Sequence, residues 1–213
     1  MFIGHYGPAF AARAAGPRVP LGVGFVAVQL LDVLFSAFLV LGVERMRIVP
    51  GFTAVNGYDL VSMPYTHSLV GALAWSALAA LAWRALRRSW REAGVVGALV
   101  LSHFVLDVPV HLPDLTLAGD DTYKLGLGLW RSRWATMALE LASLGTGVWL
   151  WRRGRRPSAR AYGFVALLAA LAVATPFLPP PPSVTVFAVQ AAVSYVALAL
   201  AAWWVDRGAD APA

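Results

Sequence analysis

The sequence contains no cysteine. This absence excludes disulfide bonds, thiolate zinc sites and cysteine nucleophiles, so any metal ion must be held by histidine, aspartate or glutamate side chains. Charged residues are also scarce: they make up 13% of the chain, whereas hydrophobic residues make up 59% and the mean hydropathy is +0.67. This balance is typical of a protein that crosses a membrane several times.

Lysine is almost absent, since Lys124 is the only lysine among 17 basic residues. The arginines lie in short runs between apolar segments, so the net charge of +6 fits the positive-inside rule better than a nucleic-acid-binding surface. We therefore expect no nucleic-acid partner. The first ten residues, MFIGHYGPAF, lack the basic and apolar regions of a cleavable signal peptide. We expect the first membrane span to anchor the protein uncleaved.

Long apolar segments predict an all-α fold, a polytopic bundle of about six transmembrane helices in the lipid bilayer. The predicted spans cover residues 20–43, 66–83, 93–112, 134–151, 161–178 and 183–205. Twelve basic residues fall on one side of this topology and five on the other. The positive-inside rule makes the richer side cytoplasmic, and it therefore places both termini in the cytoplasm.

Three regions follow from this pattern. We expect residues 1–19 to form a short helix at the membrane interface or tucked into the bundle. Residues 20–152 should form the four spans that contain polar residues, and residues 153–213 should form an apolar hairpin of two spans. Within the second region, residues 44–65 read as a loop, because Pro50-Gly51 and Asn56-Gly57 are pairs that favour turns.

The span at 93–112 carries three polar residues at intervals of four: His103, Asp107 and His111. Residues four apart lie on one face of a helix. An ionised carboxylate in mid-membrane costs about 2.5–3.5 kcal/mol on insertion scales, so Asp107 needs a partner, a metal ion or a water-filled cavity. A simple intrahelical pair between His103 and Asp107 is the structural alternative.

Other spans of the first four contribute polar residues as well. Asp32 lies in the first span, His67 at the start of the second and Glu140 in the fourth, and the predicted topology lets them converge in the outer half of the membrane. Imidazoles with carboxylates suit a divalent ion, either zinc or, alternatively, manganese or magnesium. Structural alternatives are an interfacial His67, a cross-helix pair for Asp32, and a water-facing His111.

Four short motifs resemble a known family. They are Gly4-His5, Asp32 in the first apolar stretch, Thr66-His67-Ser68-Leu69 at the start of a helix, and Ser102-His103-x-x-x-Asp107 in the next helix. Together, over residues 1–115, they resemble the predicted inner-membrane metal-dependent hydrolases, a bacterial family of largely unknown function. The resemblance implies a bacterial inner-membrane location and five metal ligands: His5, Asp32, His67, His103 and Asp107.

Three functions remain open at this point. The first is a metal-dependent hydrolase in which Glu140 or Asp59 acts as the general base on a lipid-like small molecule. The chain has no Gly-x-Ser-x-Gly segment, which disfavours a serine nucleophile. The second is a transporter or channel for protons or divalent cations. The third is a non-catalytic scaffold with a structural metal or a polar cluster that fixes helix packing.

Overall fold

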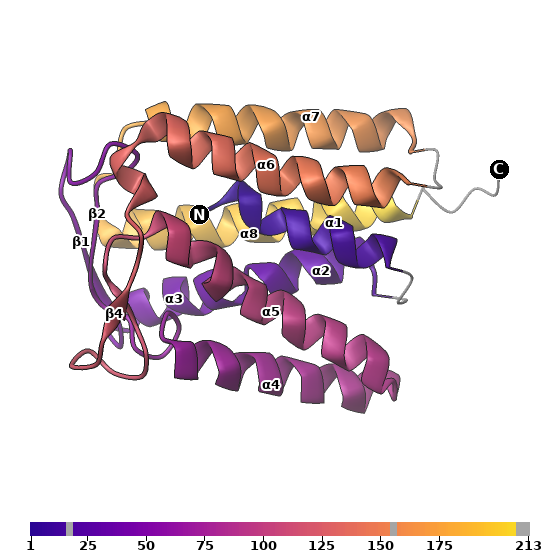
Figure 1. Ribbon diagram of the computed structural model, residues 1–213, viewed down its shortest axis with the longest axis horizontal. Coiled ribbons are helices and arrows are strands. Elements are labelled where there is room, and N and C mark those ends of the chain that lie inside the picture. Colours follow the sequence, from indigo (N-terminus) through magenta and orange to yellow (C-terminus); the bar gives the residue numbers. More distant parts are fainter. Residues whose placement is uncertain (16–18, 154–156, 208–213) are drawn as a thin grey trace.

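The computed structural model describes residues 1–15, 19–153 and 157–207. These residues are mostly helical, and they form a bundle with two short antiparallel sheets at one end (Figure 1). The helices are α1 (Tyr6–Ala14), α2 (Leu21–Val28), α3 (Leu30–Val40), α4 (Leu69–Arg87), α5 (Trp90–Val110), α6 (Arg133–Arg152), α7 (Ala159–Ala174) and α8 (Val184–Asp206). Three 3₁₀ turns are η1 (Ile3–His5), η2 (Leu129–Arg131) and η3 (Thr175–Phe177).

Several of these helices can cross a membrane. In the described part of the chain α4, α5, α8 and the segment Ala159–Phe177 are long and apolar enough, and α2 with α3 adds a fifth candidate if the bent pair is one span. The helix α6 is equally long but contains Arg133, Glu140 and Arg152, and it is not among these candidates. The structure thus supports four or five spans where the sequence predicted about six.

The predicted first span is broken at Gln29. Helices α2 and α3 meet there at a bend of 50°, and Gln29 has φ −108° and ψ 6°, outside the helical range. Its side-chain nitrogen donates a hydrogen bond to the carbonyl oxygen of Phe2 at 3.1 Å. The break makes Val28 the last residue of α2, so its carbonyl lacks an intrahelical partner and can accept a side-chain donor.

The prediction of a loop over residues 44–65 needs correction. The segment folds as an antiparallel hairpin of β1 (Arg45–Ile48) and β2 (Tyr58–Ser62), in which Arg47 lies opposite Asp59. A second, smaller pair joins β3 (Leu115–Thr116) to β4 (Lys124–Leu125). Opposite charges at facing positions stabilise strand pairing, a contact that the turn signals alone could not reveal. The fold is therefore mostly helical rather than purely α-helical.

The two ends of the bundle differ in charge. The arginine-rich end holds the α4–α5 turn and the C-terminal ends of α1, α6 and α8, whereas the hairpin end holds both small sheets (Figure 1). The nine described basic residues of the larger predicted set lie at the arginine-rich end; Arg18, Arg155 and Arg156 lie outside the described residues. The alternating course of the helices therefore agrees with the separation of basic residues that the sequence indicated.

The N-terminal segment lies inside the bundle. Figure 1 places the N-terminus between the helices, away from the arginine-rich end where a cytoplasmic terminus was predicted, and α1 then runs toward that end. Ile3, Tyr6 and Phe10 are buried. Of the two alternatives for residues 1–19, the described part thus adopts the tucked-in helix, because its apolar side chains find a core among the spans.

Two glycines allow α1 to approach α6 closely. A Cβ atom added at Gly147 would clash with the Gly7 backbone, and one added at Gly7 would clash with the backbone of Ser143. Small residues that permit such backbone contact are typical of helix interfaces in membranes. The α1–α6 contact also helps to fix the position of His5, because α1 directly follows this residue.

We expect Gly147→Ala to lower the stability of the folded protein by about 1–3 kcal/mol, because an overpacked interface must shift backbone rather than a flexible side chain. Gly145→Ala is the matched control: it lies two residues earlier on the same helix, and a Cβ there has no neighbour within 4 Å. Thermal unfolding in detergent compares the two variants. Equal melting temperatures would contradict the close-packing interpretation.

Candidate metal centre

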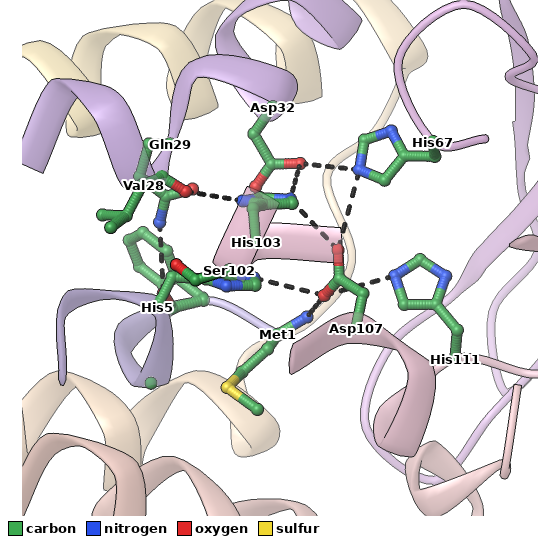
Figure 2. Close-up of polar contacts among 12 residues, drawn as sticks. Met1, His5, Val28, Gln29, Asp32, His67, Ser102, His103, Asp107 and His111 are labelled. Carbon is green, nitrogen blue, oxygen red and sulfur yellow. Dashed lines mark hydrogen bonds and ion pairs between the residues drawn. The ribbon is translucent and has the colours of Figure 1, made fainter. Parts of the chain in front are cut away.

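All four histidines of the chain converge with two aspartates inside the bundle (Figure 2). The side chains come from separate elements: His5 from η1, Asp32 from α3, His67 from the turn before α4, His103 and Asp107 from α5, and His111 from the C-terminal cap of α5. The histidines and Asp107 are buried. The fold therefore brings together the five residues that the resemblance implied, and adds His111.

Asp107 is the centre of this cluster. One of its oxygens, Oδ1, lies 3.1 Å from His5 Nε2 and 3.6 Å from His111 Nε2. The other, Oδ2, lies 3.0 Å from His103 Nε2 and 3.8 Å from His67 Nε2. All four histidines thus direct the same ring nitrogen toward one carboxylate.

Asp32 approaches from the opposite side. Its Oδ1 lies 3.3 Å from His67 Nε2 and 3.5 Å from His103 Nε2. Asp32 with His67 and His103, and Asp107 with His5 and His103, each form a group whose ligand atoms lie within 4.8 Å of one another. Both groups have the composition and spacing of a metal site.

Four of the six contacts between these side chains, at 3.3–3.8 Å, are longer than an ordinary N–H···O bond and match shared coordination of a metal ion. The six distances between imidazole nitrogens and these two carboxylates run from 3.0 to 3.8 Å. Charge-assisted N–H···O bonds are about 2.7–2.9 Å long. Two atoms that each lie about 2.0–2.1 Å from one tetrahedral ion are about 3.3 Å apart. The nitrogens and oxygens are therefore spaced as neighbouring ligands of one ion would be.

The environment of His103 fixes which of its nitrogens carries a proton. Its Nδ1 lies 2.7 Å from the carbonyl oxygen of Val28, which can only accept a hydrogen bond, so Nδ1 is the donor. In the neutral ring, Nε2 then has a lone pair that faces two carboxylates. This nitrogen is buried and has no hydrogen-bond partner among the described residues. The bend after Val28 thus orients His103 for coordination.

A chain of buried hydrogen bonds, from Glu44 through Thr66, orients His67 in the same way. The hydroxyl of Thr66 donates its only hydrogen to Glu44 Oε2 at 2.7 Å, so its oxygen accepts from His67 Nδ1 at 2.8 Å. Glu44 is 1% exposed and also accepts the backbone N–H groups of Tyr65 and Thr66. Sequence reasoning placed Glu44 only within the predicted loop over residues 44–65 and missed this role. The adjacent threonine of the Thr66-His67 pair was the available signal.

His111 shows the same pattern. Its Nδ1 lies 2.8 Å from Asp114 Oδ1, and its ring packs on Trp130 with centroids 4.1 Å apart. Three histidines therefore have Nδ1 tied to an oxygen while Nε2 faces the aspartates. Such second partners are characteristic of metal-bound histidines, whose orientation they fix. Lone pairs that face carboxylates repel unless a cation lies between them, so the cluster needs either protons or a metal ion.

We expect Thr66→Val to weaken metal binding by about 10–100-fold, the usual cost of losing an outer-shell partner. Valine keeps the size of threonine but cannot link His67 to Glu44. Thr66→Ser is the matched control, because it restores the hydroxyl and should bind metal within a few-fold of the original protein. Competition with a chelating dye measures both affinities; equal weakening in the two variants would contradict the role of this hydrogen-bond chain.

Asp32 has a further partner on α8. The hydroxyl of Tyr195 donates to Asp32 Oδ2 at 3.0 Å. The sequence interpretation treated the last two spans as an apolar hairpin and missed this contact, because a tyrosine in a span is usually an interfacial or core residue. The C-terminal hairpin therefore contributes directly to the surroundings of the cluster.

The two proposed general bases are not among the six clustered residues, although Glu140 lines the adjoining cavity described below. Both oxygens of Glu140 accept backbone N–H groups, from Phe2 at 2.8 Å and from Gly4 at 2.5 Å. These bonds hold the segment that carries His5, so Glu140 positions His5 within the cluster. Asp59 pairs with Arg47 across the hairpin at 2.5 Å and is not among the residues that line the cavity described below. Neither placement was evident from sequence, because both depend on tertiary contacts.

Asp107 also has a partner outside the cluster. The Met1 nitrogen lies 2.7 Å from Asp107 Oδ1, at hydrogen-bonding distance. The Met1 nitrogen thus gives this carboxylate a hydrogen-bond partner without a metal. It is the contact that most favours a purely structural role for the cluster.

A cavity of about 560 Å³ adjoins the cluster. Its polar floor is formed by Asp32, His67, Asp107, His111 and Glu140. Its walls are mainly apolar: Phe35, Leu60, Trp130, Pro176, Leu178 and Phe187 line it. Burial raises the pKa of the Tyr58 phenol, another lining residue from β2, which keeps that wall uncharged. The cavity thus combines a charged end with an apolar body.

Aromatic side chains fill the bundle next to His5. Tyr6 stacks on Phe25 with ring centroids 4.1 Å apart, and Phe10 packs against Phe25 and Trp151 at 5.6 and 5.4 Å. These rings belong to the core, and α1 carries Tyr6 and Phe10 from the cluster toward the arginine-rich end. The cavity, by contrast, includes residues of β2 and of the turn after α7, which belong to the hairpin end.

Comparisons of this chain with protein-family models, with curated proteins and with solved structures found no match. The motif resemblance therefore stays a prediction. The case for a function rests on the geometry of the cluster and its cavity.

Proposed function

We propose that the protein is a membrane-embedded hydrolase that uses a divalent metal ion held by His5, Asp32, His67, His103 and Asp107. One observation carries this proposal: histidines with Nδ1 tied to oxygen atoms direct Nε2 at two carboxylates. Zinc suits this set of nitrogen and oxygen ligands, and manganese is the next choice. When bound, such an ion supplies a Lewis acid that polarises a phosphoryl or carbonyl oxygen and activates water.

The residues around the centre bind and orient the substrate in this proposal. The mainly apolar walls exclude water and fit the apolar part of a lipid-like molecule, while its polar group reaches Asp32 and His67 at the floor. Glu44 holds the ligand His67 in place through Thr66, and Tyr195 holds the ligand Asp32 directly. With the arginine-rich end in the cytoplasm of a bacterium, the cavity belongs to the outer half of the inner membrane.

A transporter has less support from the described residues. A transport pathway needs polar groups along the whole membrane. The aromatic contacts of Tyr6, Phe10 and Phe25 occupy the core beside the cluster, on the way to the arginine-rich end. This arrangement favours a site reached from one side.

The proposal is tested by hydrolysis assays on detergent-purified protein that has been stripped with a chelator and reloaded with zinc or manganese. The panel contains model phosphodiesters, amides and lipid esters, and Asp32→Asn serves as the ligand variant. We expect turnover of one substrate class that depends on the metal and is lost in Asp32→Asn. Turnover that survives metal removal would overturn the proposal, as would an inactive loaded protein that instead moves the metal ion across liposome membranes.

A further inference from the structure

The cavity opens beside the start of α8. Most of its lining residues are buried or half-buried, and the exposed ones are Leu178, Pro179, Pro182 and Gln190. These four lie in the turn between α7 and α8 and near the start of α8 itself. They therefore form the mouth of the cavity, whereas the clustered histidines and Asp107 lie at its buried end.

With α8 as a membrane span, this mouth faces lipid. Val189 and Val193, on either side of Gln190, are 54% and 63% exposed on this candidate span. Gln190 lies about 9 Å along the helix from its first residue, Val184, and so falls within the apolar length of the span. Its backbone carbonyl accepts the Ser194 hydroxyl, but its side-chain amide has no partner among the described residues. Because an unpaired polar group in lipid is costly, this amide is placed to bind a polar group that enters the mouth.

A polar strip on α8 connects the mouth to the cluster. Gln190, Ser194 and Tyr195 all line the cavity. The hydroxyl of Tyr195 donates to Asp32, and Gln190 lies about 7.5 Å before Tyr195 along the helix axis. A molecule that contacts Gln190 can therefore reach the proposed metal ligands with a group only a few atoms long.

The charge of the cavity selects among lipid head groups. Its described lining residues include three carboxylates, from Asp32, Asp107 and Glu140, but neither lysine nor arginine. Proteins commonly bind phosphate groups with arginine or lysine. Asp32 and Asp107 alone offset the charge of one divalent ion, so an anionic head group would find no net positive charge here. An uncharged head group fits these surroundings better.

We propose that the substrate is an uncharged acyl lipid, an ester or an amide, that enters sideways from the bilayer past Gln190. The inference rests on the proposed function and specifies its substrate. The Gln190 amide binds the head group, the acyl carbonyl reaches the cluster, and the acyl chain lies along the apolar walls. Hydrolysis then breaks the acyl C–O or C–N bond: the hydroxyl of water joins the acyl carbon, and its proton goes to the leaving alcohol or amine.

The test measures lipid binding without turnover. The full-length chain is stripped of metal, placed in lipid nanodiscs and exposed to two light-activated probes that share one diazirine-bearing acyl chain. One probe is a monoacylglycerol, and the other is the anionic lysophosphatidic acid. Peptide mass spectrometry locates the labelled residues. We expect the uncharged probe to label the cavity walls, at Leu60 and Phe187 for example, and the anionic probe to label them several-fold less.

Variants of α8 test the route. Ala191→Trp places a large ring at a lining position and should eliminate labelling of the walls. Val193→Trp is the matched control, because Val193 is exposed on the same helix and is not among the lining residues. Gln190→Leu should raise the probe concentration for half-maximal labelling by about 2–10-fold, the usual net effect of one lost hydrogen bond.

Other results would count against the inference. Labels confined to the outer faces of the helices, or wall labelling that Ala191→Trp leaves unchanged, would overturn the entry route. Equal labelling by the two probes would overturn the preference for an uncharged lipid.

The same measurement separates this inference from the proposed function, because the stripped protein needs no metal to bind the probe. Labelled walls in a protein that hydrolyses nothing when loaded would overturn the proposed function and leave a lipid site. Metal-dependent hydrolysis of a phosphoester, without labelled walls, would overturn this inference and leave the hydrolase.

Discussion

Asp107→Asn is expected to weaken metal binding by more than about 100-fold and to eliminate metal-dependent hydrolysis. The substitution removes the charge that faces all four histidines but keeps the side chain's size. Loss of an outer-shell partner already costs about 10–100-fold in affinity, and Asp107 contacts the ion directly in our account. Competition with a chelating dye measures the affinity on purified protein.

Asp206→Asn is the matched control for this prediction. Asp206 is also a buried carboxylate, but it lies at the arginine-rich end and accepts hydrogen bonds from Arg13 Nε at 2.9 Å and the Leu21 backbone at 3.0 Å. Its loss should lower stability and leave metal affinity unchanged. Equal metal affinities in Asp107→Asn and the original protein would show that Asp107 is not a metal ligand.

Chelation should lower the melting temperature by about 8–16 °C. An ion that binds only the folded state at 1,000 times its dissociation constant stabilises that state by about 4 kcal/mol, and 1 kcal/mol shifts melting by about 2–4 °C for a chain of this length. Removal also leaves Asp32 and Asp107 facing imidazole lone pairs. Unfolding scans with and without a chelator measure the shift.

Two controls identify the source of that shift. Adding zinc back should restore the melting temperature, and the same chelator should leave Asp107→Asn almost unchanged. A stripped protein that melts at the same temperature as the loaded one would mean that no ion stabilises the fold. The Met1 nitrogen beside Asp107 would then be the more important partner of that carboxylate.

The sequence predicted the part of the site that lies within single helices. The spacing of His103 and Asp107 on α5 follows directly from helical periodicity, and the cost of a carboxylate in a membrane required a partner. His111 was expected on the same helical face; it lies just beyond the helix as its C-terminal cap, yet its Nε2 still reaches Asp107. The local sequence pattern was sufficient here because His103, Asp107 and His111 all lie on α5 or directly after it.

The supporting contacts could not be predicted because they join residues far apart in the chain. Glu44 reaches Thr66, Tyr195 reaches Asp32, and the Val28 carbonyl becomes available only because α2 and α3 bend at Gln29. Hydropathy treated residues 20–43 as one continuous span and gave no sign of the bend. Such contacts depend on packing, which local pattern does not specify.

His5 shows the same limit. The predicted topology put the N-terminus in the cytoplasm, from which His5 could reach an outer-half site only by folding deep into the bundle. The structure brings His5 to the cluster with a tucked-in segment: Glu140 accepts the N–H groups of Phe2 and Gly4, and Gly7 and Gly147 allow α1 to lie against α6. Counting basic residues in loops cannot predict a terminal segment that folds into the bundle.

The most direct test of the central claim is the metal content of the detergent-purified protein. Elemental mass spectrometry is applied to the original protein and to His103→Ala, both purified without chelators and reloaded with zinc or manganese. Our account predicts one or two equivalents of metal in the original protein and their loss in His103→Ala. No bound metal in the folded, reloaded protein, or undiminished metal in His103→Ala, would contradict it.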